Sequence, residues 1–168
     1  MVHNIDQINR AGRLLLQMEA TIAVAESVTS GNLQVAFSLA ENATLFFQGG
    51  ITAYNIGQKC RHLLVEPIHA IATNCVSKQV SEQLATGVCG FFKSDFGIGI
   101  TGYASPVPEK NIKQLFAYVA IAKGQSIVTS KKITTRCEKP LDVQIDFTYR
   151  AIQLLFNALK KDKKTLAF

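Results

Sequence analysis

Short apolar runs alternate with segments of helical periodicity along this chain of 168 residues. Residues 21–25 and 96–100 are rich in apolar side chains and carry no charge, which is typical of strands buried on both faces of a sheet. The segments around them place apolar residues three and four positions apart, as amphipathic helices do. This alternation predicts an α/β fold, a three-layer α/β/α sandwich built on a mixed sheet.

The same patterns predict the individual elements. We expect helices at residues 4–18, 32–40 and 55–64, from residue 77 onward, and at 140–161. We expect strands at 21–25, 45–54, 96–100, 115–122 and 127–135, with a hairpin turn at 123–126. Asn4 and Ser77 are the expected helix caps. The helix at 55–64 is expected to bury four side chains, those of Ile56, Cys60, Leu63 and Leu64. The helix from 77 is expected to bury Val80, Leu84, Val88 and Phe91.

The charge of the chain is concentrated at one end. Four lysines and one aspartate within residues 160–164 supply half of the formal net charge of +6. A basic segment at the end of a helix suits the helix dipole and is usually solvated. Nucleic-acid binding through the tail at 160–168 is therefore not the favoured prediction.

Composition also bears on location and metal binding. The sequence has no apolar run of the roughly 20 residues that a membrane span needs, and it opens without a signal pattern, so a cytoplasmic protein with no membrane contact is expected. We expect one domain over residues 1–168. The four cysteines stand far apart, which favours buried free thiols over a disulfide framework or a metal site; they are Cys60, Cys75, Cys89 and Cys137.

Two polar loops follow short apolar strands, at residues 26–31 and 101–106. In open α/β sheets, ligands bind outside the carboxyl ends of the strands. The turn at 27–31, which leads into a helix, is a candidate cradle for an anion or a phosphate. The alternative is that its hydroxyls only cap the helix.

Residues 97–102 match the glycine pattern G-x-G-x-x-G of dinucleotide-binding sites. Two of these glycines lie inside the expected strand, and Pro106 disfavours a helix directly after it. We therefore reject the match and expect the glycines to let a helix pack close to the strand.

Tyr54 and Lys59 lie where one strand ends and the next helix begins. A partly desolvated lysine can act as a general base, and a tyrosine can orient or relay a proton. The alternative is a strand-end aromatic residue and a solvated lysine. No serine, cysteine or histidine arrangement of the common hydrolase motifs occurs in the sequence.

Three ordered motifs together carry a family resemblance over about residues 5–160. They are Ala25-Glu26-Ser27-Val28-Thr29-Ser30-Gly31, the Tyr54 to Lys59 spacing, and Thr101-Gly102-Tyr103-Ala104-Ser105-Pro106. In this combination the chain resembles the CinA C-terminal domain family, which includes nicotinamide-nucleotide amidases. The resemblance implies deamidation of nicotinamide mononucleotide, a small phosphorylated nucleotide, without a metal or cofactor. It also implies a homo-oligomer.

The resemblance implies roles for particular residues. Ser27 and Thr44 compete as the nucleophile, with Tyr54 and Lys59 assisting. The residues expected to bind substrate are Glu26, Thr29, Ser30, Gly31, Gly50, Thr101, Gly102 and Ser105. The chain departs from the usual family wording at four positions: Val28, Ser30 and Ser105 lie within these motifs, and Thr44 stands where the family usually has a serine, shortly before the strand that contains Gly50. These departures leave a second hypothesis, a catalytically impaired relative that binds a nucleotide-like ligand or a protein partner.

Overall fold

The structure is a computed structural model that describes residues 5–166, with only the backbone described for 163–166. Its helices are α1 (Ile5–Gln17), α2 (Asn32–Ser38), α3 (Ile56–Leu63), α4 (Pro67–Ala72), α5 (Lys78–Phe92) and α6 (Pro140–Leu166). Its strands are β1 (Ile22–Glu26), β2 (Phe47–Thr52), β3 (Phe96–Gly102), β4 (Phe116–Lys123) and β5 (Ser126–Thr134). Two short 3-10 helices, η1 (Ala43–Leu45) and η2 (Pro108–Lys110), lie in connecting segments.

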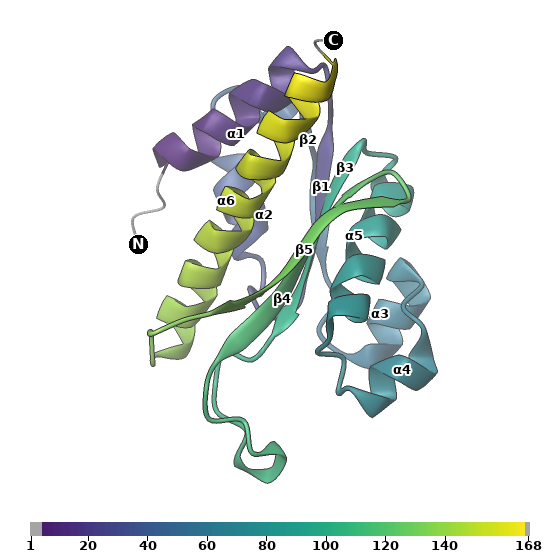
Figure 1. Ribbon diagram of the computed structural model, residues 1–168, viewed down its shortest axis with the longest axis vertical. Coiled ribbons are helices and arrows are strands. Elements are labelled where there is room, and N and C mark those ends of the chain that lie inside the picture. The colour runs from purple at the N-terminus through teal and green to yellow at the C-terminus, as the bar shows by residue number, and fades with distance from the viewer. Residues whose placement is uncertain (1–4, 167–168) are drawn as a thin grey trace.

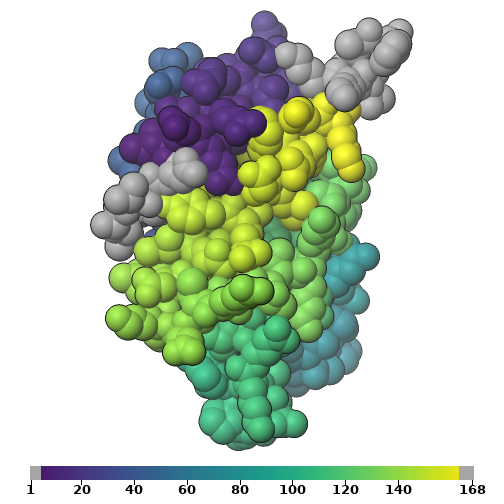
Figure 2. Space-filling model, turned by 60° about the vertical axis from the view of Figure 1, so that its left-hand side comes forward, coloured from purple at the N-terminus to yellow at the C-terminus, as the bar shows by residue number. Residues whose placement is uncertain are grey.

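The five strands form one mixed sheet in the order β2-β1-β3-β4-β5. The first three are parallel, whereas β4 and β5 are antiparallel to their neighbours. Helices α1, α2 and α6 cover one face of the sheet, and α3, α4 and α5 lie on the other (Figure 1). From another side, α6 runs alongside α1, and the segment around η2 projects from one end (Figure 2). The predicted three-layer α/β/α architecture is confirmed.

The two faces of the sheet carry side chains of different size. The face toward α1, α2 and α6 holds large residues such as Val24, Ile98 and Ile121, all fully buried. The face toward α5 holds alanines and glycines. A Cβ on Gly97 would lie 2.3 Å from the carbonyl oxygen of Ala85, and one on Gly99 would lie 2.2 Å from that of Ser81. The glycines therefore serve close helix–strand packing, as expected, and not a dinucleotide.

The central strands separate at their carboxyl ends. β1 pairs with β2 as far as Glu26 with Thr52, but its pairing with β3 ends at Ala25 with Gly99. Beyond this point the loop after β1 and the loop after β3 are no longer joined by the sheet. An opening in the fold is thus placed where the two polar loops of the sequence stand.

Several predictions about individual elements need correction. The sequence does not predict helix α4, because its six residues, the first of which is Pro67, are too few to display helical periodicity. Leu64, expected to be buried, is 81% exposed because it is the left-handed C-cap of α3. The buried residues of that helix are Lys59 and Leu63. Phe91 is also exposed.

The remaining element predictions differ from the structure at their bounds. The second strand is shorter than residues 45–54, because η1 occupies its predicted start. The final helix continues past 161 to Leu166. The predicted cap Asn4 lies outside the described residues, as do the side chains of Lys163 and Lys164 in the basic tail. Of the cysteines, only Cys89 is buried; the other three free thiols are partly exposed.

Candidate functional site

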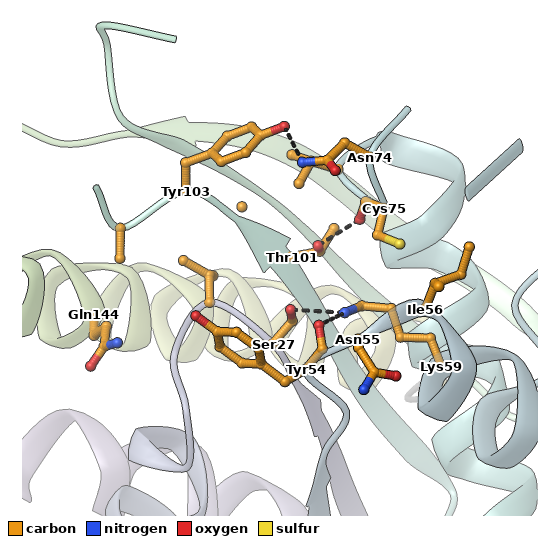
Figure 3. Close-up of a pocket in the computed structure, with 14 residues that line it drawn as sticks. Ser27, Tyr54, Asn55, Ile56, Lys59, Asn74, Cys75, Thr101, Tyr103 and Gln144 are labelled. Atoms are coloured by element: carbon orange, nitrogen blue, oxygen red, sulfur yellow. Dashed lines mark hydrogen bonds between the residues drawn. The ribbon is translucent and has the colours of Figure 1, made fainter. Parts of the chain in front are cut away.

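A cavity of about 370 Å³ lies at the carboxyl ends of β1 and β3 (Figure 3). Its walls come from the loop after β1, the start of α3, the link between α4 and α5, the loop after β3, and α6. The lining residues are Ser27, Val28, Tyr54, Asn55, Ile56, Lys59, Asn74, Cys75, Val76, Thr101, Gly102, Tyr103, Ala104 and Gln144. The cavity therefore draws together all three motifs on which the family resemblance was based.

Lys59 and Ser27 meet inside this cavity. Lys59 lies in the first turns of α3, and Asn55 caps that helix by accepting a hydrogen bond from the backbone N–H of Gln58. The helix directs the lysine side chain inward, where it is only 1% exposed. Its Nζ lies 3.1 Å from Ser27 Oγ and donates a 2.7 Å hydrogen bond to the carbonyl oxygen of Tyr54.

The charge of Lys59 has little compensation at this position. In the described part of the chain no carboxylate forms an ion pair with it. Burial therefore lowers the pKa of Lys59 below its ordinary value of 10.5, and the nearby thiols of Cys75 and Cys60 oppose that shift only in part. A neutral amine has a lone pair that can accept the proton of the Ser27 hydroxyl.

Tyr54 contributes its backbone and not its phenol to this pair. Its carbonyl oxygen fixes Lys59 Nζ, whereas the residue as a whole is 74% exposed. In Figure 3 the phenol points away from the amine, toward Gln144. The expectation that the tyrosine hydroxyl relays a proton to Lys59 is not met in this arrangement.

Glu26 fills the position that the sequence indicated as an anion cradle. Its carboxylate is fully buried and accepts hydrogen bonds from the backbone N–H groups of Gly31, Leu33 and Gln34. The Gln34 side chain donates a fourth hydrogen bond, at 3.2 Å. An internal carboxylate thus takes the N–H groups at the start of α2 that a bound phosphate would need. Glu26 holds the loop carrying Ser27 and does not line the cavity.

The wall opposite Ser27 is held by two hydrogen bonds. Thr101, at the end of β3, donates from its hydroxyl to the carbonyl oxygen of Cys75 at 2.7 Å. Asn74 donates from its side-chain amide to the Tyr103 hydroxyl at 3.2 Å (Figure 3). Both Asn74 and Cys75 adopt positive φ, so the link before α5 turns sharply into the cavity.

Of the residues predicted to bind substrate, Thr101 and Gly102 line the cavity. The others lie outside it. Gly31 forms the positive-φ start of α2, and Thr29 is buried with a hydroxyl that lacks a partner among the described residues. A side chain at Gly50 would collide with Gln34, the partner of Glu26. Ser30 and Ser105 are exposed, although Ser30 Oγ accepts a 3.5 Å hydrogen bond from Gln144.

Thr44 is far from this site along the sheet. It lies in η1, before β2 begins, and is exposed. Because β2 runs parallel to β1, with Phe47 beside Ile22, Thr44 stands near the amino end of the strands. Ser27 follows the carboxyl end of β1. Within one chain, the structure therefore excludes Thr44 from the Lys59 pair and leaves Ser27 as its hydroxyl.

Sequence reasoning missed the lining residues contributed by the α4–α5 link and by α6. Asn74, Cys75 and Gln144 belong to no motif, and only the tertiary fold brings them to Ser27. Over the described residues, no group of three or more histidine, cysteine or acidic side chains gathers as a metal site. Nor is any helix there both long and apolar enough to traverse a bilayer.

Comparisons with known proteins agree with this architecture. The family model of the CinA C-terminal domain matches residues 5–159. A CinA-like protein from Chlorobium chlorochromatii is 34% identical over 125 residues, which are 73% of this chain and 29% of that protein. One from a Picosynechococcus species is 38% identical over 120 residues, 71% of this chain and 29% of that protein. The match thus spans less than a third of the length of these curated relatives.

Solved structures share the fold at lower sequence identity. A competence-damaged protein (CinA) superfamily protein from Klebsiella pneumoniae superimposes with a TM-score of 0.87 at 22% identity, covering 93% of this chain and 97% of that one. A competence or damage-inducible protein from Enterobacter asburiae gives 0.85 at 22% identity, covering 92% and 96%. The match of the family model across residues 5–159 is decisive: this chain belongs to the CinA C-terminal domain family.

Proposed function

We propose that this chain hydrolyses a carboxamide to a carboxylate and ammonia, with Ser27 as the nucleophile and Lys59 as the general base. Nicotinamide mononucleotide or a related amide is the proposed substrate, from the family resemblance. The observation that carries the proposal is the 3.1 Å approach of Lys59 Nζ to Ser27 Oγ inside a cavity. A serine hydroxyl is a weak nucleophile until an adjacent base takes its proton.

The acylation step uses groups already in place. Ser27 Oγ attacks the amide carbon while its proton passes to the lone pair of neutral Lys59. The tetrahedral intermediate then collapses, and the carbon–nitrogen bond breaks as the Lys59 ammonium gives its proton to the departing NH2 group, which leaves as ammonia. Water enters, loses a proton to Lys59 and cleaves the acyl ester. Ser27 recovers its proton from Lys59, so the chain ends unchanged.

Backbone groups beside Ser27 supply the oxyanion stabilisation that such a step needs. The backbone N–H of Val28, which lines the cavity, has no acceptor among the described residues. The same is true of the backbone N–H of Thr29. Removal of one oxyanion donor typically costs about 100- to 1,000-fold in rate. We assign the developing negative charge to the Val28 N–H, the nearer of the two to Ser27 in the chain.

The test is ammonia release from nicotinamide mononucleotide and related amides by the purified chain. Turnover that disappears in Ser27→Ala supports the proposal. A rate no higher than that of Ser27→Ala, for every amide supplied, would overturn it. Ligand binding without any turnover would favour the second hypothesis instead, a catalytically impaired relative that binds a nucleotide-like ligand.

A further inference from the structure

Two tyrosines line the cavity, and they differ in how firmly the described residues hold them. Tyr103 donates its backbone N–H to the carbonyl oxygen of Phe116 at 2.9 Å, and its ring meets the Phe116 ring edge-on, with 5.5 Å between the ring centroids. The hydroxyl of Tyr103 accepts a 3.2 Å hydrogen bond from Asn74. Tyr54 is mostly exposed, and no hydrogen bond within the described residues holds its hydroxyl. Tyr103 is therefore the better fixed of the two rings.

The fixed ring lies where the rest of a substrate must extend. Figure 3 shows Tyr103 on the wall opposite Ser27 and Tyr54, with its hydroxyl turned toward Asn74. An amide held at Ser27 and Lys59 directs the group attached to its carbonyl carbon into the space between these walls. The cavity, at about 370 Å³, falls near the lower end of the roughly 300–1,000 Å³ of small-molecule sites, so this group comes against the Tyr103 ring.

A fixed tyrosine ring favours a flat partner. Aromatic rings attract other flat rings edge-on or offset-stacked, and their faces attract planar cations. A ring that is already held loses little freedom when a ligand binds, so more of this attraction appears as affinity. None of the fourteen lining residues is acidic. The aromatic rings are thus the lining groups suited to a flat, cationic ring such as the pyridinium of nicotinamide mononucleotide.

We infer that Tyr103 is a specificity-determining residue, whose ring binds the flat ring of an aromatic carboxamide while the amide itself lies at Ser27. Asn74 is its positioning residue, because it holds the Tyr103 hydroxyl. The inference rests on the proposed amidase function. The cavity thereby selects aromatic carboxamides over saturated ones.

Replacement of the ring tests this role, with Tyr118 as the matched control. The Tyr118 ring also meets Phe116 edge-on, at 5.8 Å, but Tyr118 does not line the cavity. Tyr103→Leu should raise KM for nicotinamide mononucleotide about tenfold, as expected for loss of an aromatic pair, and leave kcat within about threefold. Tyr118→Leu should leave KM within about twofold. An unchanged KM in Tyr103→Leu, or an equal rise in both variants, would overturn the inference.

Benzamide and cyclohexanecarboxamide test the preference for a flat ring. Both carry a carboxamide on a ring of the same size, but only the benzamide ring is flat. Calorimetry on Ser27→Ala, which cannot turn an amide over, should show benzamide binding about fivefold more tightly. Addition of Tyr103→Leu to Ser27→Ala should reduce this preference to about twofold or less. Equal binding of the two amides by Ser27→Ala, or a preference that survives Tyr103→Leu, would overturn the inference.

Asn74→Gly and Tyr103→Phe test the positioning role, because each breaks the hydrogen bond and keeps the aromatic ring. Glycine suits the positive φ of Asn74, so this variant adds no backbone strain. Each variant should raise KM about threefold. The double variant should rise no further than either one alone, since both changes remove the same bond. A rise in the double variant equal to the product of the two single rises would overturn the positioning role.

The inference and the proposed function fail in different ways. Binding of nicotinamide mononucleotide that depends on Tyr103, without ammonia release by the natural chain, would overturn the amidase function and keep the role of Tyr103. Ammonia release with a KM that Tyr103→Leu leaves unchanged would do the reverse.

Discussion

Glu26 and Lys59 are both buried near the same end of β1, but hydrogen bonds compensate the charge of Glu26 far more fully than that of Lys59. The Glu26 carboxylate accepts four hydrogen bonds from Gly31, Leu33 and Gln34. The Lys59 amine has two neutral oxygen partners and no ion pair within the described residues. A buried carboxylate that accepts several hydrogen bonds stabilises the loop that carries it. A buried amine with few partners has a lowered pKa and loses its proton more readily. We therefore propose that the first group is structural and the second reactive.

Removal of the poorly matched amine should have the largest effect on activity. Lys59→Met should lower kcat for ammonia release by about 100- to 10,000-fold, the usual contribution of a general base. KM should change little, because the amine binds Ser27 and Tyr54 rather than the bulk of the substrate. Lys78→Met is a matched control, since the Lys78 side chain is 67% exposed. Retention of more than a tenth of the activity by Lys59→Met would refute the role of the amine.

Removal of the matched charge should act mainly on stability. Glu26→Gln turns one acceptor oxygen into an amide that faces N–H donors at the start of α2. We expect a loss of about 2 kcal/mol in the free energy of unfolding, from urea titrations followed by circular dichroism. Activity should fall less than in Lys59→Met, because Ser27 is displaced but present. Glu41→Gln, at an exposed ion pair with Arg13, should change stability by less than about 0.5 kcal/mol. Equal losses of stability in Glu26→Gln and Glu41→Gln would contradict the structural role of Glu26.

The lowered pKa of Lys59 also predicts how stability depends on pH. Between that lowered pKa and 10.5, the unfolded chain holds the lysine proton that the folded chain has lost. The free energy of unfolding should therefore rise with pH across this window, by up to about 1.4 kcal/mol per pH unit. Lys59→Met lacks this contribution. The amount by which its free energy of unfolding exceeds that of the natural chain should therefore be greatest at neutral pH and shrink toward pH 10. Urea titrations of both chains at several pH values measure the difference, and a constant difference would contradict the prediction.

The smallest effect on activity and stability is expected at Thr44, which lies far from Lys59. Thr44→Ala should leave kcat within about twofold and the free energy of unfolding within about 0.5 kcal/mol, as usual for an exposed site. Ser27→Ala, assayed in parallel, should abolish turnover. A loss of 100-fold or more in Thr44→Ala would return the nucleophile to Thr44 and require a neighbouring copy to bring it to Lys59.

The fold was largely predictable because its signals are local. Strands such as β1 and β3 are buried on both faces and read as apolar runs, and α5 and α6 are long enough to display their periodicity. The wrong predictions concern a helix end and a short helix, where the pattern of apolar residues does not determine the backbone conformation. Leu64 is apolar but stands at a left-handed helix end, and α4 is too short to produce a pattern.

The site was predictable only in its motifs. The sequence predicts Ser27 and Lys59 as site residues, but spacing alone could not place them 3.1 Å apart, since that distance depends on where α3 lies relative to the end of β1. Glu26 is predicted to bind substrate, whereas its carboxylate accepts from the backbone N–H groups at the start of α2; the sequence does not say whether a helix N-terminus meets a ligand or an internal carboxylate. Gln144 lies 117 residues beyond Ser27 in the chain and reaches the cavity only through the packing of α6.

The Lys59 amine, beside Ser27, should give up its proton more readily than an ordinary lysine. Nuclear magnetic resonance of the chain with ¹³C-labelled lysine side chains measures this directly, and Lys59→Met assigns the Lys59 signal by its disappearance. We predict a Lys59 signal that titrates with a midpoint below 10.5. A Lys59 midpoint at or above 10.5 would show that burial does not lower the pKa of this amine.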